Sequence, residues 1–390
     1  MPDWNYPTTI KFGNGRISEL PQLCEELNMH CPLIVTDPGL AHFSFIIKIE
    51  QSLPCASIFS DIKPNPNGSN IEAGVAAFKH GKHDGIIAVG GGSALDAGKA
   101  IALMAGQSLP IWDFEDVGDN WKQVNEARVV STIAIPTTAG TGSEVGRASV
   151  IVDEDSQSKK IIFHPLMLPK CVILDPELSQ ALPAPLTAAT GLDAFVHNFE
   201  AFCAPSYHPM AEGIALQGMK LIKDWLPEAY HNGRNLDARA HMLSASTMGA
   251  TAFQKGLGAC HALAHPLGAL YDKHHGLLNA VLLPYVINTN ASAIEDKLQA
   301  ICQYLNIEKD LPHESYKKAF LTWLLDFRRE LDIPQNLTDI GIHTDDAISR
   351  EHSIGELAFA DPSAAGNPIP LTAEQYQTLF QQAVDGELLI

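Results

Sequence analysis

The pattern of hydrophobic and polar positions divides the chain into two halves. In the first half, short apolar runs alternate with amphipathic stretches. Continuous apolar runs are typical of strands buried on both faces of a parallel sheet, and the amphipathic stretches are typical of helices that cover it. We expect strands at residues 31–37, 56–62, 84–92, 129–136 and 170–176, and helices at residues 69–80, with Ser69 as N-cap, and 93–105.

The second half of the chain has the helical period and no strand pattern. Pro227, Gly233 and Gly256 separate the predicted helices, and the proline-containing segment QALPAPLTAAT marks the boundary between the halves. We therefore predict an α/β domain with a parallel, Rossmann-like sheet at residues 1–184 and an all-α domain at residues 185–390. The expected helices are residues 187–203, 208–226, 237–253, 258–270, 276–288, 293–305, 314–330 and 372–385.

Length, charge and cysteine usage restrict the class of protein. A chain of 390 residues is long enough for two domains. The net charge of −19 argues against a nucleic-acid or anionic-membrane partner. Seven scattered cysteines without a CxxC pair indicate reduced thiols rather than a disulfide framework. We see no signal peptide and no apolar run near the ~18 residues of a membrane span, so we expect a cytoplasmic protein.

Two clusters of polar side chains suggest a metal site. Asp193 and His197 lie four residues apart, which places both on one face of a helix. The segment GLGACHALAHPLGALYDKHHG adds four of the 16 histidines. A carboxylate with three imidazoles suits Fe²⁺ or Zn²⁺. On these residues alone, a surface Asp–His hydrogen bond, a core packed with imidazoles and a pH-sensitive surface remain open.

Two glycine-containing loops each follow a predicted strand. AVGGGSALDAGKA leads into a helix, a geometry that can hold a pyrophosphate, although it matches neither GxGxxG nor a Walker loop. IPTTAGTGSE offers hydroxyl groups beside glycines. Ligands of open α/β sheets bind at the carboxyl ends of the strands, where both loops would lie. The alternative for each loop is a structural turn. Asp37 ends its strand and can accept bonds from an adenosine ribose or open an Asp-Pro-Gly turn.

Taken together, these segments resemble the iron-containing (group III) alcohol dehydrogenases. The resemblance runs from the N-terminal strand to about residue 290, and the last 90 residues carry no motif that we can use. It implies a nucleotide-binding α/β domain and a helical domain, with the metal and substrate in the cleft. It rests on GGGSALDAGKA, PTTAGTGSE, DPELSQALPAPLTAATGLDAFVHNFEAF and CHALAHPLGALYDKHHGLLNAVLLP.

The resemblance also implies the site residues. It assigns Asp193, His197, His261 and His275 as metal ligands; His275 is preferred to His274 because the family's ligand immediately precedes a glycine. His265 would lie in the active site near the nicotinamide and the substrate, with second-layer packing as its alternative. The expected cofactor residues are Asp37, Asn65, Gly91, Gly92, Ser93, Asp96, Thr137, Thr138, Thr141, Lys159 (with Lys160 as the alternative register) and Leu178.

One position departs from the family pattern. Gly146 stands where the family often has threonine, and Arg147 follows it. A cation there could favour an acidic substrate, but we prefer a salt bridge at the strand edge.

The expected activity is hydride transfer between NAD(H) and a small primary alcohol or aldehyde, with Fe²⁺ or Zn²⁺ as Lewis acid. Related alternatives are a polyol dehydrogenase and a dehydroquinate-synthase-like lyase; maleylacetate reductases typically lack the metal ligands. A metal-dependent hydrolase or a non-catalytic metal-binding protein is the alternative from another class. The family resemblance implies a homodimer or a larger homo-oligomer.

Overall fold

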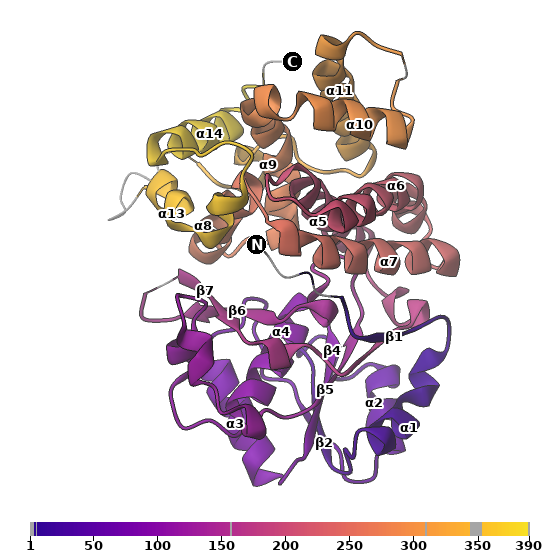
Figure 1. Cartoon of the computed structure of the whole chain (residues 1–390). Helices are drawn as coiled ribbons and strands as arrows, with labels where there is room; N and C mark the ends of the chain where they lie inside the picture. Colours follow the sequence, from indigo (N-terminus) through magenta and orange to yellow (C-terminus); the bar gives the residue numbers. More distant parts are fainter. Residues whose placement is uncertain (1–3, 5, 157, 309, 344–352, 389–390) are drawn as a thin grey trace. The chain divides into compact units, whose positions relative to one another are not determined.

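A computed structural model describes residues 4, 6–156, 158–308, 310–343 and 353–388 of the chain (Figure 1). The chain forms two compact units, one of residues Tyr6–Leu182 and the other of residues Pro183–Ile390 together with Trp4. The first unit contains the strands and the second unit is helical (Figure 1). The predicted fold class, an α/β part followed by an all-α part, is confirmed.

The first unit is built on a six-stranded parallel sheet with the order β1-β8-β5-β4-β2-β3. Five of these strands were predicted from the hydrophobic pattern, whereas β1 was named only as the N-terminal strand of the family resemblance. All residues of the central strands β2, β4, β5 and β8 are buried, as their continuous apolar runs indicate. The strands are β1 (Thr9–Phe12), β2 (Pro32–Val35), β3 (Ser57–Phe59), β4 (Gly85–Gly90), β5 (Thr132–Pro136) and β8 (Cys171–Leu174).

Helices cover both faces of this sheet. Helices α1 (Leu20–Glu26) and α2 (Ser44–Ser52) share a hydrophobic core with alternate residues of the strands, such as Ile87 and Val89 of β4. The intervening residue Ala88 faces α4 (Gly92–Met104), where an added Cβ at Gly98 would lie 2.6 Å from the Ala88 methyl carbon. This glycine lets α4 pack closely on β4, the strand that precedes it.

Helix α3 (Gly68–His80) begins one residue before the predicted start, and its N-cap is not Ser69. Asn67 caps it instead, because the side chains of Asn67 and Asn70 bond reciprocally to each other's backbone N–H groups. The Ser69 hydroxyl lies inside the first turn and donates to Glu154 at 2.7 Å.

An antiparallel hairpin of β6 (Ala148–Asp153) and β7 (Ser158–Phe163) was missed from the sequence. Asp96 of α4 fixes it in place: its carboxylate accepts from the Val150 N–H at 2.9 Å and from the Ser143 hydroxyl, and it pairs with buried Lys99 at 3.2 Å. Burial lowers the pKa of Lys99 although Asp96 and Glu144 act in the opposite direction.

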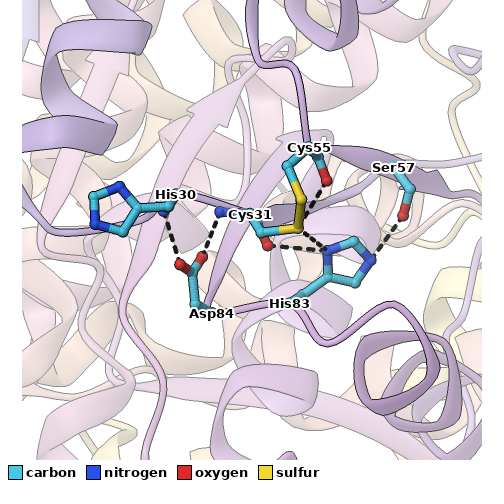
Figure 2. Close-up of a disulfide and its surroundings, with 6 residues drawn as sticks. All are labelled: His30, Cys31, Cys55, Ser57, His83 and Asp84. Carbon is cyan, nitrogen blue, oxygen red and sulfur yellow. Dashed lines mark hydrogen bonds between the residues drawn. A yellow bond between two sulfur atoms is a disulfide. The ribbon is translucent and has the colours of Figure 1, made fainter.

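The first unit contains a disulfide between Cys31 and Cys55 (Figure 2). The expectation of reduced thiols is therefore wrong for this pair. Parallel pairing of β2 and β3 brings the residues before the two strands together, with a Cα–Cα distance of 4.7 Å across 24 positions of sequence. The five other cysteines are free and buried, namely Cys24, Cys171, Cys203, Cys260 and Cys302.

His83 and Asp84 lie beside this disulfide and contact the backbone at Cys31 (Figure 2). The Nδ1 atom of His83 lies 2.9 Å from the Cys31 carbonyl oxygen, and its Nε2 atom lies 2.8 Å from the Ser57 hydroxyl. The Asp84 carboxylate accepts from the backbone N–H groups of His30 and Cys31, each at 2.8 Å. These bonds tie the turn before β4 to the starts of β2 and β3.

The second unit is a set of packed helices close to those predicted. Helix α6 runs through Pro227 to His231, so the prediction that it ends at residue 226 is wrong. Helix α13 (Ile354–Ala360) was missed. The other helices are α5 (Ala184–Cys203), α6 (Pro209–His231), α7 (Leu236–Ala252), α8 (Ala259–Tyr271), α9 (His275–Asn290), α10 (Glu295–Leu305), α11 (Tyr316–Glu330) and α14 (Ala373–Asp385).

Within the described residues, no single helix combines the length and apolar character needed to cross a membrane. One bent pair, His275–Ala293 with Glu295–Leu305, meets the length and composition criteria only when the two helices are taken together.

Candidate active site

Helix α5 carries the predicted Asp193 and His197 on one face, and both side chains are almost fully buried. A glycine of α9 allows that helix to approach α5 closely: an added Cβ at Gly276 would lie 2.5 Å from the Ala189 carbonyl oxygen of α5. Asp193 is thereby held within the helical core rather than at its surface. The surface Asp–His pair considered from the sequence is excluded by this burial.

Helices α8 and α9 supply the predicted histidines. His261 is fully buried on α8, and His265 lies one turn further along. His275 is the first residue of α9, whereas His274 is its N-cap and accepts from the Leu277 N–H at Nδ1. The capping role of His274 supports the choice of His275 as the ligand.

Three of the four expected ligands converge. Asp193, His261 and His275 each place one potential ligand atom within 4.8 Å of the others. His197 is not in this group; its ring stacks on His261 with a centroid distance of 4.6 Å and lies 5.3 Å from the Phe253 ring. Its role as the fourth ligand stays a prediction.

Glu200 orients His261 and was missed from the sequence. Its carboxylate lies 2.6 Å from His261 Nδ1 and accepts from the Cys260 N–H at 2.7 Å. Burial by itself lowers the pKa of His261, but the charges of Glu200 and Asp193 and the hydrogen bond to Glu200 outweigh it, so the pKa is raised. With its Nδ1 proton directed to Glu200, His261 offers Nε2 as a metal ligand.

The contacts of Asn279 show which kind of group fits between the converging atoms. Its amide nitrogen lies 2.8 Å from Asp193 Oδ1 and 3.1 Å from the Nε2 atom of each of His261 and His275. One electropositive NH₂ group thus contacts the same three atoms that would hold an ion. A carboxylate oxygen and two imidazole nitrogens that all face one point fit a divalent metal of the Fe²⁺ or Zn²⁺ type.

Glu200 and Asn279 were both missed from the sequence, where each had only a weak signal. Glu200 lies three positions after His197, and Asn279 lies four positions after His275. Each spacing places the side chain on the same helical face as a predicted ligand. Spacing alone does not separate such a partner from an ordinary core or surface residue.

His265 lies beside this cluster but outside the group of three. Its ring stacks on His275 with a centroid distance of 5.3 Å and meets His261 edge-on at 5.9 Å. Its Nδ1 atom lies 2.8 Å from Asp361 Oδ2. Asp361 belongs to the last 90 residues, where the sequence offered no motif.

The two predicted loops lie next to each other in the first unit. The glycine loop follows β4 and the threonine loop follows β5, and these strands pair in parallel. An added Cβ at Gly92 would lie 2.5 Å from the Thr141 hydroxyl, and one at Gly91 would lie 3.4 Å from the Thr138 hydroxyl. Thr137 donates its N–H to the Gly90 carbonyl at 3.0 Å. Gly91 is the N-cap of α4 and provides no side chain to cap it, which leaves the helix N-terminus open to an anion.

Asp37 lies beside the glycine loop. After β3 the chain crosses to the opposite side of β2, so the ends of β2 and β4 form the point where the strand order reverses. A Cβ at Gly90 would lie 3.3 Å from Asp37 Oδ2, while Asp37 Oδ1 accepts from the Leu40 N–H at 3.0 Å. The turn interpretation of Asp37 is confirmed for one carboxylate oxygen. The other oxygen lies near the glycine loop, and its contact with an adenosine ribose stays a prediction.

Two predicted cofactor residues are bonded within the protein. Both carboxylate oxygens of Asp96 are engaged by the contacts described above, and the Ser93 hydroxyl donates to the Pro64 carbonyl. Asp96 therefore supports the glycine loop through bonds within the protein. Leu178 is buried in the core beside α1 and α2.

The lysines of β7 differ in their contacts. Lys160 pairs with Asp153 at 3.1 Å and with Glu115 at 3.4 Å, so its charge is already neutralised. Lys159 points to the opposite face of the strand, and its place beside the cofactor stays a prediction. Arg147 places its guanidinium over the Phe163 ring at 5.5 Å. Asn65 is half-buried in the turn before α3.

Comparison with known proteins agrees with this arrangement. Residues 7–176 match the family described as iron-containing alcohol dehydrogenase, and residues 187–384 match its C-terminal family. The chain is 35% identical to 4-hydroxybutyrate dehydrogenase of Cupriavidus necator, over 97% of this chain and 99% of the relative. It is 31% identical to the NAD-dependent methanol dehydrogenase of Bacillus methanolicus, over 98% of this chain and 100% of the relative.

A solved structure gives the same result for the fold. The crystal structure of a 1,3-propanediol oxidoreductase superposes with a TM-score of 0.92 at 33% identity, covering 98% of this chain and 100% of the other. Matches over both units, together with the convergence of Asp193, His261 and His275, exclude a metal-dependent hydrolase as the best interpretation. The chain belongs to the iron-containing alcohol dehydrogenase family, and it is an NAD-dependent oxidoreductase of alcohols.

Proposed function

We propose that this enzyme interconverts a small primary alcohol and its aldehyde with NAD(H), and that it uses a divalent metal, Fe²⁺ by preference. The convergence of Asp193, His261 and His275 on one point carries the proposal. A buried carboxylate and two oriented imidazoles have no other evident purpose in a helical core, where unpaired polar groups are costly.

In this proposal Asp193, His261 and His275 hold the metal, and His197 completes the shell. A bound divalent ion supplies Lewis acidity that lowers the pKa of an alcohol hydroxyl and polarises a carbonyl group. Glu200 keeps His261 in the tautomer that presents Nε2. The Asn279 amide must turn away from these ligand atoms, or exchange its hydrogen bonds, when an ion is present.

For the cofactor, we assign the pyrophosphate to the open N-terminus of α4 at Gly91, Gly92 and Ser93. The hydroxyls of Thr137, Thr138 and Thr141 line the adjacent loop, and Asp37 accepts bonds from the adenosine ribose. We assign Asn65, Lys159 and Leu178 to further cofactor contacts and Asp96 to support of the loop. The juxtaposition of Gly92 with Thr141 and of Gly90 with Asp37 supports these assignments.

His265 is the residue that we assign to proton transfer. It lies beside His261 and His275 without belonging to the group of three ligand atoms. An imidazole in that position can accept the hydroxyl proton while the hydride leaves the carbinol carbon.

A panel of alcohols tests the substrate class. Methanol, ethanol, 1,3-propanediol, 4-hydroxybutyrate and glycerol are each offered with NAD⁺, and NADH absorbance is followed. We expect the highest kcat/KM with an unbranched primary alcohol. A clear preference for glycerol or another vicinal polyol would favour the polyol dehydrogenase alternative, and Arg147→Ala shows whether a carboxylate-bearing alcohol depends on that cation.

We further propose that the enzyme is a cytoplasmic homodimer or larger homo-oligomer without a nucleic-acid or membrane partner. The acidic net charge of −19 supports the absence of polyanionic partners. Light scattering coupled to size-exclusion chromatography measures the mass directly; a mass of 42.2 kDa would identify a monomer and contradict the proposed assembly.

A further inference from the structure

A carboxylate from the C-terminal part of the chain contacts His265, the residue that we assign to proton transfer. Asp361 follows α13, and its Oδ2 atom lies 2.8 Å from His265 Nδ1. The side chains of His265 and Asp361 are only 12% and 11% exposed. Burial alone raises the pKa of Asp361, but the neighbouring His265 and the bonds from Ser363 outweigh it and lower the pKa, so a carboxylate is maintained there.

The second carboxylate oxygen of Asp361 is also hydrogen-bonded. Its Oδ1 atom accepts from the Ser363 N–H at 2.8 Å, at the start of the short helix Pro362–Gly366. Asn367 then anchors this segment to α8 and α9. Its Oδ1 accepts from the Ala259 N–H at 3.1 Å and from the Asn290 amide at 2.8 Å. The carboxylate thus reaches His265 from a support tied to the same two helices that carry the histidine cluster.

The Asp361–His265 contact resembles the Glu200–His261 contact in form, but its consequence differs. In both cases a buried carboxylate engages Nδ1 of an imidazole. For His261 the remaining Nε2 atom belongs to the group of ligand atoms, whereas His265 lies outside that group. The second carboxylate therefore directs an imidazole that is available for proton exchange rather than for metal binding.

We propose that Asp361 is a positioning residue for catalysis: it holds the His265 ring and keeps its proton on Nδ1, so that Nε2 takes the hydroxyl proton of the alcohol. The inference rests on the proposed function of His265. In the forward reaction the C–H bond of the carbinol breaks and its two electrons pass with the hydride to NAD⁺. The O–H proton goes to Nε2 and then to solvent, which leaves aldehyde, NADH and one proton.

A double-mutant cycle tests whether Asp361 affects turnover through His265. Asp361→Asn keeps the shape of the side chain but offers one acceptor oxygen, which cannot serve both Ser363 and His265. We expect kcat to fall about 10- to 100-fold while metal content, the KM for NAD⁺ and the melting temperature stay close to wild type. Asp385→Asn, an exposed change on α14 of the same unit, serves as the control.

The double variant Asp361→Asn/His265→Ala should be no slower than His265→Ala alone, because each change removes the same function. Losses of kcat that multiply in the double variant, or a lowered melting temperature in Asp361→Asn, would reduce Asp361 to a structural residue. Unchanged kinetics in His265→Ala would also overturn the inference, since there would be nothing to position.

Nitrogen NMR of histidine-labelled, zinc-loaded enzyme gives a readout independent of turnover. At a pH where His265 is neutral, we expect its proton on Nδ1 in the wild type and a mixture of the two tautomers in Asp361→Asn. The His265→Ala variant identifies the signals. A proton on Nε2 in the wild type, or identical spectra in both proteins, would refute the positioning role, whereas an inactive wild type with the expected spectra would refute only the proposed function.

Discussion

At the scale of single residues, the three converging ligand atoms of the cluster share one polar neighbour within the helical core. Asp193 and the Nε2 atoms of His261 and His275 share the amide of Asn279, while Glu200 directs the other nitrogen of His261. A buried polar group without such a partner costs about 1–3 kcal/mol. This arrangement keeps the ligand atoms oriented and also provides the atoms that a cation would take over.

The first prediction concerns the ligands. His261→Ala and Asp193→Ala should each remove most of the bound metal and nearly all activity, because each leaves an incomplete shell. The fold should persist, since these residues lie within a large apolar core. Elemental analysis together with circular dichroism checks this, and His274→Ala, which removes the N-cap of α9 beside the proposed ligand His275, is the control. A metal-free variant with full activity would refute the metal mechanism.

The second prediction concerns the choice of cofactor. Asp37 places one carboxylate oxygen against the glycine loop, where it would repel a 2′-phosphate. Asp37→Gly should therefore raise kcat/KM with NADP⁺ relative to NAD⁺. Steady-state kinetics with both cofactors measures the ratio. A wild-type enzyme that prefers NADPH would show that Asp37 has been placed wrongly.

What the sequence predicted at this scale depended on spacing. Asp193, His261 and His275 were identified because their motifs are distinctive, and the structure brings them together. Glu200, Asn279 and Asp361 were not identified. Their roles depend on contacts between different helices, and for Asp361 the partner lies 96 positions away. A polar residue on a buried helical face has no signature in sequence until its neighbours are known.

At the scale of elements, loops and strand starts fix the first unit. The Cys31–Cys55 disulfide joins the starts of β2 and β3, opposite the end of the sheet where the glycine loop lies. Asp96 joins α4 to the β6–β7 hairpin. Neither connection was predictable, because the disulfide depends on which strands are neighbours in the sheet and the Asp96 contacts depend on how the hairpin packs on α4.

The third prediction is that the disulfide stabilises the first unit. Closing a loop of 24 positions limits the unfolded chain and contributes about 3 kcal/mol to the free energy of unfolding in the loop-entropy account. Reduction with a dithiol should lower the urea midpoint. The Cys31→Ser/Cys55→Ser variant, which has no disulfide to lose, should not respond to the dithiol.

A thiol count decides whether the disulfide forms. Unfolded protein should titrate five thiols before reduction and seven after it. Seven thiols without any reductant would contradict the disulfide and restore the expectation of reduced cysteines.

The fourth prediction concerns Asp96. Asp96→Ala should destabilise the first unit by about 3 kcal/mol, because it leaves the buried Lys99 ammonium without its carboxylate. It should also loosen the hairpin that bears Lys159. Urea unfolding with Asp155→Ala, an exposed site in the hairpin turn, as control measures the difference. An unchanged midpoint would show that Asp96 is not a structural residue.

At the scale of the whole molecule, the sequence predicted the division into an α/β half and a helical half because the two hydrophobic periods differ. The parallel sheet, its covering helices α3 and α4 and the approximate ends of most helices in the second half followed from that pattern, whereas the covering helices α1 and α2 were missed. The antiparallel hairpin was missed because β7 begins with the polar residues Ser158, Lys159 and Lys160 and is partly exposed along most of its length, so its sequence resembles a loop. Pro227 did not end its helix, because the packed surface of α6 continues to His231.

One measurement tests the central claim most directly. The purified enzyme is analysed for metal, stripped with a chelator, and assayed with a primary alcohol and NAD⁺ before and after Fe²⁺ or Zn²⁺ is restored, beside the His261→Ala variant. We predict about one divalent ion per chain, loss of NADH formation on stripping, and recovery in the wild type alone. NADH formation that persists in the fully stripped enzyme would contradict the claim that this is a metal-dependent alcohol dehydrogenase.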